Sequence, residues 1–195
     1  MIISRQRKFI YIHVPRTGGF SVEAALRQWS DIDSGRVLNG HASAMLLSQL
    51  ISDWRTYFSF AFVRNPWDFW VSLYHHILTV GPVHPEWARV SCTRDFRGYM
   101  GDYILRRFER RYILNQIDYV VGNDGKLLVN FVGRYEHLLP CFEFSCRQIG
   151  IPRCDLPRIN TSRRRADYRT YYDETTKKIV SKVSRNDISA FGYEF

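Results

Sequence analysis

The feature that most constrains the fold is a short apolar segment followed at once by a glycine turn and a helix-like pattern. Residues 9–14 (FIYIHV) are aromatic and β-branched and end at Pro15, which predicts a buried strand. A turn containing Gly18 and Gly19 follows, and residues 21–29 carry apolar side chains at helical spacing. Strand, glycine turn and helix in this succession form the opening unit of an α/β fold.

The same pattern occurs a second time. Residues 57–63 (YFSFAFV) are almost continuously apolar, as in a strand that is covered on both faces of its sheet. Pro66 suits the first turn of a helix, and the apolar positions from Trp67 to Leu78 predict a helix that ends near Gly81. Two such units in succession predict a central, mostly parallel sheet flanked by helices.

Weaker patterns predict the remaining elements. The expected order is a helix, two strands and two more helices: residues 94–110, 118–121, 127–132, 136–149 and from 173 onward. The turn at residues 122–125 (GNDG) would join the two strands, and Asp173 can cap the last helix. Residues 152–168 are irregular and dense in Arg and Pro, but no interdomain linker is evident.

Length and composition indicate one globular domain spanning residues 1–195. The chain is 45% apolar and 15% aromatic, so burial can offset its ordering entropy and a disordered protein is excluded. No apolar run approaches the roughly 20 residues of a membrane span, so we expect no membrane partner and a cytoplasmic location. The four cysteines lack any CxxC pair or zinc spacing, so reduced, mostly buried thiols and no metal site are expected.

The charge of the chain is the first indication of function. The sequence has 28 Lys and Arg against 19 Asp and Glu, a formal net charge of +9. A surplus of this size favours an anionic partner: a nucleic acid, a phosphorylated cofactor, an acidic glycan or a membrane surface. The charge does not choose among these partners, and a merely soluble basic surface is also compatible with it.

The first candidate site is the turn after the first strand, residues 15–21 (PRTGGFS). Its two glycines allow a tight turn, so that successive N–H groups and the start of the next helix can converge on an anion. Thr17 and Ser21 can add hydroxyl donors, and Arg16 adds a cation. The spacing is not that of a Walker A loop, and a plain strand-to-helix turn would suit the glycines equally well. His13, on the preceding strand, is assigned a structural role.

The second candidate site begins at Arg64, at the end of the second strand, where α/β folds bind ligands. Ser72 lies about two turns into the following helix, whose side chains tilt toward its N-terminus, so Ser72 can face back toward Arg64. A guanidinium and a hydroxyl aimed at one point form a phosphate site. The alternative is an ion pair of Arg64 with a carboxylate such as Asp68. His75 and His76 on the same helix point about 100° apart and cannot act as paired ligands.

Together, the two segments resemble the signature of sulfotransferases that use 3′-phosphoadenosine-5′-phosphosulfate (PAPS). HVPRTGGFS is similar to the family's 5′-phosphosulfate loop, usually PKTGGTS, and FVRNPWDFWVSLY is similar to its 3′-phosphate motif, RNPxxxxxS. The resemblance is to the carbohydrate 2-O-sulfotransferase-like branch rather than to the small-phenol enzymes. Later segments that share it are residues 132–136, 160–168, 171–172 and 191–193.

The resemblance implies a P-loop-like sulfotransferase fold and a role for each residue that matches a motif. Arg16 would neutralise charge on the leaving phosphosulfate bridge, where the family has lysine. The other residues implied to bind the nucleotide are Thr17, Gly18, Gly19, Phe20 and Ser21 at the 5′ end, Arg64 and Ser72 at the 3′-phosphate, and Arg163 and Arg164 near the 3′-phosphate or the acceptor.

The catalytic base that the resemblance implies is His41. The branch commonly carries its base in a Gly-His context between the two motifs, and residues 40–43 (GHAS) match that context. An imidazole can take a hydroxyl proton near neutral pH as that oxygen attacks sulfur. An ordinary loop or helix-start histidine is the alternative.

The reaction expected from the resemblance is in-line transfer of a sulfuryl group from PAPS to a hydroxyl of a glycan or small glycoside. The product nucleotide would be adenosine 3′,5′-bisphosphate (PAP), and neither a metal nor a nucleic acid would take part. Arg16 in place of lysine and Phe20 in place of threonine depart from the family pattern. Three alternatives stay open: an inactive PAPS-binding relative, a P-loop-like nucleotide kinase and a basic nucleic-acid-binding module.

Overall fold

The structure is a computed structural model that describes residues 1–31, 41–109, 115–152, 154–159, 164 and 166–195. The chain forms two compact units. The first comprises Met1–Arg64 and Gln116–Asn160, and the second comprises Asn65–Asn115 and Thr161–Phe195. The single domain expected over residues 1–195 stays a prediction.

The first unit is built on a four-stranded sheet of order β1-β2-β3-β4. The strands are β1 (Ile2–Ser4), β2 (Phe9–Ile12), β3 (Phe58–Val63) and β4 (Phe131–Arg134). Strands β2, β3 and β4 run parallel, and only the edge strand β1 is antiparallel to its neighbour. The predicted mostly parallel sheet is therefore confirmed, with both of the strands that the apolar segments indicated.

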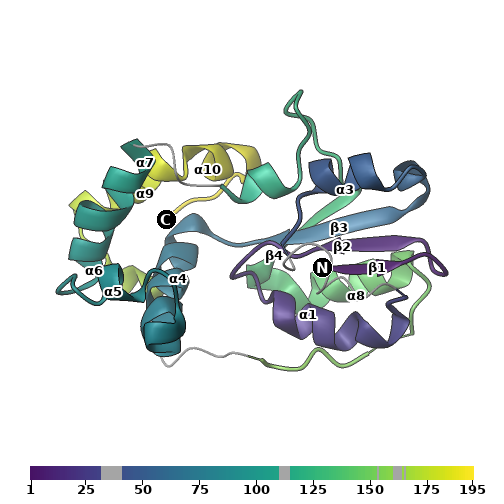
Figure 1. The fold of residues 1–195 in the computed structure, drawn as a ribbon, viewed down its shortest axis with the longest axis horizontal. Coiled ribbons are helices and arrows are strands. Elements are labelled where there is room, and N and C mark those ends of the chain that lie inside the picture. The colour runs from purple at the N-terminus through teal and green to yellow at the C-terminus, as the bar shows by residue number, and fades with distance from the viewer. Residues whose placement is uncertain (32–40, 110–114, 153, 160–163, 165) are drawn as a thin grey trace. The chain divides into compact units, whose positions relative to one another are not determined.

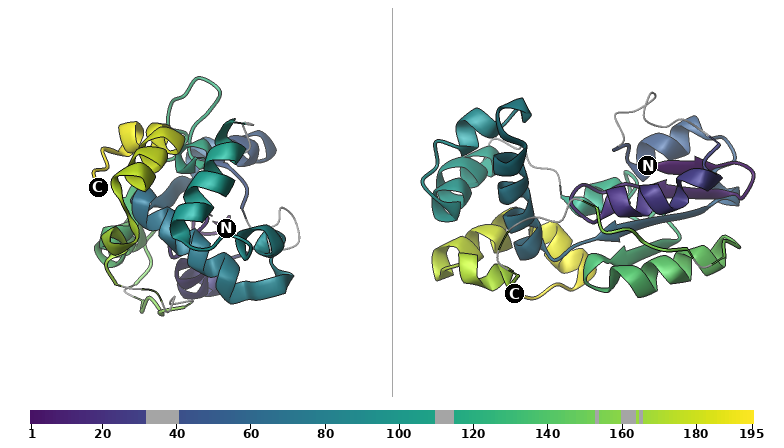
Figure 2. Two further views of the ribbon diagram at one scale, coloured as in Figure 1. Left: turned by 90° about the vertical axis from the view of Figure 1, so that its left-hand side faces the viewer. Right: turned by 90° about the horizontal axis from the view of Figure 1, so that it is seen from below.

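Helices cover both faces of this sheet (Figures 1 and 2). Helices α1 (Gly19–Leu26) and α8 (Leu138–Gln148) lie along one face, and α3 (Ala44–Leu50) lies on the other. The core between the sheet and the first pair consists of aromatic strand residues packed on aliphatic and aromatic helix residues: Phe9, Tyr11, Phe60, Phe62, Val22, Ala25, Leu26, Phe142 and Cys146. These strand residues alternate along β2 and β3, as one face of a pleated sheet requires.

The predicted strand at 118–121 is wrong, and the following strand lies later than predicted. Gln116–Tyr119 forms a 3₁₀ helix, and residues 121 and 127 form only an isolated bridge. The physical reason is the side chain of Gln116, which accepts from the N–H of Arg64 at 2.8 Å and donates to its carbonyl at 2.8 Å. One amide side chain thus satisfies the backbone at the end of β3 in place of a neighbouring strand.

The second unit is helical in its described part. Its longest helix, α4 (Pro66–Val80), begins as predicted: the side chain of Asn65 accepts from the N–H of Trp67 at 3.0 Å, and Pro66 occupies the first turn. It ends at Gly81, whose φ of 70° is in the left-handed region that favours glycine. The other helices are α5 (Trp87–Val90), α6 (Phe96–Gly98), α7 (Arg106–Glu109), α9 (Glu174–Val183) and α10 (Arg185–Phe191).

The helix predicted over 94–110 is only partly α-helical. Residues Tyr99–Leu105 form a π-helix between α6 and α7. The short 3₁₀ turns of the molecule are Arg27–Trp29, Trp54–Thr56, Gly81–Val83, Gln116–Tyr119, Tyr135–His137 and Tyr168–Tyr171. All four cysteines are free, as predicted, but the expectation that most of them are buried is wrong, since only Cys146 is buried. In the described part of the chain, no helix is both long and apolar enough to cross a bilayer.

Candidate functional site

The turn between β2 and α1 has the backbone of an anion-binding loop. Arg16 and Gly18 have φ angles of 64° and 80°, in the left-handed region. The N–H groups of residues 17–20 donate to no other residue in the described part of the chain. Unpaired N–H groups at the start of a helix attract an anion, because the helix dipole adds positive potential there.

Packing explains why this turn carries two glycines. A Cβ on Gly19 would lie 2.0 Å from Nε2 of His13, and a Cβ on Gly18 would lie 2.8 Å from Cδ2 of Leu138. The imidazole of His13 therefore lies directly against the first residue of α1. Any larger residue at position 19 would displace either this ring or the loop backbone.

The side chains of the loop differ in what they offer a ligand. The buried hydroxyl of Thr17 donates to the carbonyl of Val14 at 2.8 Å, so Thr17 retains only its backbone N–H for a ligand. Ser21 Oγ accepts from the N–H of Ile159 at 3.2 Å, and its own proton remains to be donated. Phe20, which replaces a hydroxyl-bearing residue of the family pattern, is 49% exposed.

His41 lies close to this loop, with its tautomer defined by a backbone contact. Its Nδ1 is 3.0 Å from the carbonyl oxygen of His13. Because a carbonyl only accepts, Nδ1 carries the proton, and in the neutral ring Nε2 carries a lone pair. The rings of His41 and His13 are 4.5 Å apart, and His13 also packs on Gly19. One residue thus bridges the predicted base and the anion-binding loop.

A half-buried carboxylate supports His13 from helix α1. Glu23 Oε1 accepts from Nδ1 of His13 at 2.8 Å and also contacts the amino group of Met1. Burial would raise the pKa of Glu23, but these hydrogen bonds outweigh it and lower the pKa to about 2. Burial lowers the pKa of His13, so the ring stays neutral and donates to a charged acceptor. Sequence reasoning missed Glu23, although helix side chains that tilt toward the N-terminus were a usable signal.

Arg64, from the second candidate site, contacts the anion-binding loop between β2 and α1. Its guanidinium is buried, donates to the carbonyl of Arg16 at 3.0 Å and lies 4.1 Å from the centre of the Tyr135 ring. The end of β3 and the anion-binding loop are therefore adjacent within the first unit. Tyr135 and Gln116, which hold Arg64 in place, were not identified from the sequence, because both lie far from it along the chain.

The remaining predicted residues belong to the second unit or lie outside the described part. Ser72 is buried in α4, one helical turn beyond Asp68. Asp68 forms an ion pair with Arg164, with Oδ1 2.5 Å from Nη2. Arg163 and Gly40 lie outside the described residues.

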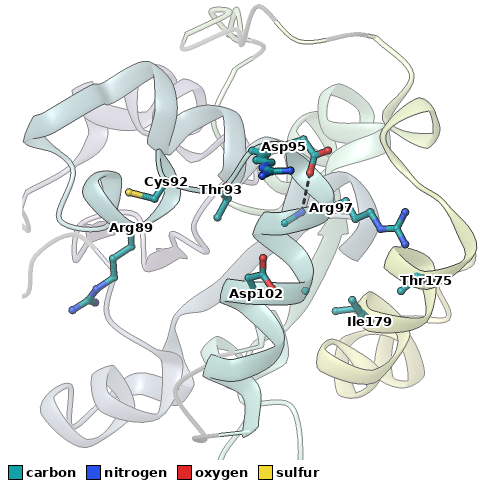
Figure 3. Close-up of a pocket in the computed structure, with 11 residues that line it drawn as sticks. Arg89, Cys92, Thr93, Asp95, Arg97, Asp102, Thr175 and Ile179 are labelled. Carbon is teal, nitrogen blue, oxygen red and sulfur yellow. Dashed lines mark hydrogen bonds between the residues drawn. The ribbon is translucent and has the colours of Figure 1, made fainter.

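A polar hollow of about 670 Å³ opens elsewhere in the second unit (Figure 3). Arg97 of α6, Asp102 of the π-helix and Thr175 of α9 border it. Arg97 is also paired with Asp173 at 3.3 Å, and Asp95 is occupied in capping α6. None of the predicted site residues that the structure describes lines this hollow.

The sheet and its loop define an α/β protein with an anion-binding turn at the carboxyl end of a strand. A family model described as the sulfotransferase family matches residues 1–194, so the chain belongs to the sulfotransferase family. Members of this family are enzymes that transfer sulfuryl groups to hydroxyl-bearing acceptors, generally from PAPS. Comparisons with curated proteins and with solved structures gave no match.

Proposed function

We propose that this protein transfers a sulfuryl group from PAPS to a hydroxyl group of a carbohydrate acceptor. The observation that carries the proposal is the arrangement within the first unit. Unpaired N–H groups of residues 17–20 start a helix, and His13 joins that loop to His41, whose Nε2 is unprotonated in the neutral ring. An anion-binding turn beside a histidine base is what sulfuryl transfer to a hydroxyl requires.

The loop fits the 5′ end of the donor. The glycine pair leaves room for a phosphate to approach the backbone, and Ser21 keeps a proton to donate. PAPS supplies a sulfuryl group whose bond to a phosphate oxygen breaks as the acceptor oxygen bonds to sulfur. Arg16 and the N–H groups of residues 17–20 stabilise the charge that grows on the departing oxygen.

His41 is proposed as the general base. Its Nδ1–H donates to the carbonyl of His13, so Nε2 takes the proton of the acceptor hydroxyl as that oxygen attacks. The same hydrogen bond holds the ring in this tautomer while the proton is transferred.

The motif in the sequence assigns the 3′-phosphate to Arg64 and Ser72, with Arg163 and Arg164 at the 3′-phosphate or the acceptor. Arg64 and Ser72 fall in different units, so this assignment rests on the motif and not on geometry. The carbohydrate nature of the acceptor and the absence of a metal or nucleic-acid partner are likewise proposed from the resemblance. The cytoplasmic location is proposed because the sequence has no apolar run of membrane-spanning length.

The test is a sulfuryl-transfer assay that follows PAP release from PAPS with a panel of glycosides and oligosaccharides. His41→Ala should lower turnover by about 100-fold or more while leaving PAP binding unchanged, because only the proton transfer is lost. His76→Ala, on a helix of the other unit, is the control and should change neither quantity. Full turnover in His41→Ala would place the base elsewhere.

The same assay addresses the 3′-phosphate and the inactive alternative. Arg64→Ala should weaken PAP binding by about tenfold or more, and unchanged binding would refute the assignment of the 3′-phosphate to Arg64. If the wild-type protein binds PAP but forms no PAP from PAPS with any acceptor, it is an inactive relative. The departures from the family pattern at Arg16 and Phe20 would agree with that result.

A further inference from the structure

Four buried polar side-chain atoms of the second unit make no hydrogen bond to any described residue, and two of them are nitrogen atoms: Nε2 of His75 and Nη1 of Arg164. Buried nitrogen atoms of this kind are normally paired, and an exception points to an ion, a water or a ligand that completes the site. The two atoms belong to residues that lie far apart in the sequence. Neither residue borders the hollow shown in Figure 3.

His75 belongs to a polar face of α4. Asp68, Ser72 and His75 occupy helix positions i, i+4 and i+7, which share a face. Asp68 and Ser72 are buried, and His75 is half-buried. The three side chains therefore form a polar stripe, with the hydroxyl of Ser72 between a carboxylate and an imidazole.

Arg164 packs against this stripe. Its side chain is only 11% exposed, and Nη2 pairs with Asp68 at 2.5 Å. The guanidinium is also close enough to His75 that, after burial, its charge is the second cause of the lowered pKa of that ring. Asp68 thus holds Nη2 of the Arg164 guanidinium, and Nη1 can donate to another acceptor.

No carboxylate in the described part of the chain forms an ion pair with His75. The ring of His75 forms T-shaped contacts with Tyr171 and Tyr74, with ring centres 5.1 Å and 5.3 Å apart. The charged group that lowers the pKa of His75 is Arg164. An anion between Arg164 and His75 would accept from both nitrogens, whereas a cation would be repelled by the guanidinium.

We propose that His75 binds the 3′-phosphate of the donor nucleotide, together with Ser72 and Arg164. Nε2–H of His75, Nη1–H of Arg164 and the hydroxyl of Ser72 donate to the phosphate oxygens, while Asp68 positions the arginine. This inference rests on the proposed function, because that function supplies the nucleotide.

The proposal has a consequence for pH. A dianionic phosphate favours protonated His75, so binding of the 3′-phosphate takes up a proton where the free ring is neutral. The preference for a nucleotide with a 3′-phosphate should therefore increase as the pH falls from about 8 to about 6.5.

The experiment is isothermal titration of the full chain with PAP and with adenosine 5′-monophosphate, which lacks only the 3′-phosphate, at about pH 6.5 and about pH 8. The quantity compared is the affinity for PAP divided by the affinity for adenosine 5′-monophosphate. His75→Ala should reduce this ratio by about tenfold at the lower pH and remove its pH dependence. His75→Gln keeps an N–H donor without the charge, so it should retain part of the ratio but none of the pH dependence. His76→Gln, on another side of the same helix, is the control and should behave as wild type.

The outcomes separate this inference from the proposed function. If wild type prefers PAP and both His75 variants keep its ratio and pH dependence, the assignment of His75 is overturned and the proposed function stands. If wild type shows no preference for PAP, both are overturned. Thermal melting of His75→Gln identifies loss of folding, and a folded variant with wild-type ratios counts against the proposal.

Discussion

At the scale of single residues, the anion-binding loop is shaped by a histidine outside it. His13 directly follows β2, yet its ring occupies the space where a side chain at position 19 would begin. Glu23 accepts from the same ring, and His41 donates to the carbonyl of the same residue. The role of His13 is thus wider than the structural one predicted from the sequence, because it joins the loop, α1 and the proposed base.

Gly19→Ala should therefore cost about 1–3 kcal/mol of stability, since the added methyl overlaps a buried ring that Glu23 and β2 hold in place. Thermal melting measures the loss, and PAP titration should show weaker binding because the loop must move. Gly101→Ala is the matched control, because no described atom lies within 4 Å of a Cβ added there. Its free energy of unfolding should be within about 0.5 kcal/mol of the wild-type value. Equal melting of the two variants would refute the packing argument.

At the scale of elements, the start of α9 carries a complete capping box. The side chain of Asp173 accepts from the N–H of Thr176 at 2.8 Å, and Thr176 Oγ1 accepts from the N–H of Asp173 at 2.9 Å. These hydrogen bonds lower the pKa of Asp173 below its usual range. The helix beyond the cap buries Ile179, Val180 and Val183, so a defined start sets the register of this apolar face.

Asp173→Ala should lower the free energy of unfolding by about 1 kcal/mol, because the N–H of Thr176 in the first turn loses its side-chain acceptor. For a chain of 195 residues this corresponds to a fall in melting temperature of roughly 2–4 °C. Glu174→Ala, which changes the neighbouring exposed carboxylate, is the control and should shift melting by less. A control that destabilises as much as Asp173→Ala would assign the effect to charge and not to the cap.

The elements that sequence reasoning predicted correctly are those whose apolar residues recur at the spacing of a helix or a strand. Strands β2 and β3 and helices α1, α4, α8 and α9 have apolar patterns long enough to identify. The edge strand Ile2–Ser4 is too short to show a period, and the predicted strand at 118–121 failed because Gln116 uses its side chain as a backbone partner.

The candidate site was predictable only where its residues are neighbours in the sequence. The glycine turn and the polar end of β3 are local motifs, and the structure places Arg64 next to the turn. The partners Glu23, Gln116 and Tyr135 are defined by packing between elements, which no local pattern encodes. The same holds for His75, since its relation to Arg164 needs a distant segment to lie against α4.

At the scale of the whole molecule, the net charge of +9 favours an anionic ligand without choosing one. The choice comes from features that bind a compact phosphate group: the N–H groups of residues 17–20 and Nη1 of Arg164, which make no hydrogen bond to a described residue. A nucleic acid would instead be recognised by cations spread along a surface, with a steep dependence on salt. A kinase would need Mg²⁺ with its nucleotide, and the loop lacks the Lys-Ser or Lys-Thr end of a Walker A motif.

Thermal melting with ligands distinguishes these classes, because binding to the native state raises the melting temperature by mass action. PAP at about 100 times its dissociation constant should stabilise the protein by about 2.7 kcal/mol. For this length that is a rise of roughly 5–10 °C. ATP with Mg²⁺, and a DNA duplex at about 150 mM salt, should give a much smaller rise. A rise with ATP and Mg²⁺ that exceeds the rise with PAP would favour a kinase. A rise in melting temperature with DNA and with no other ligand would favour a nucleic-acid-binding protein, in which the glycine turn binds no nucleotide.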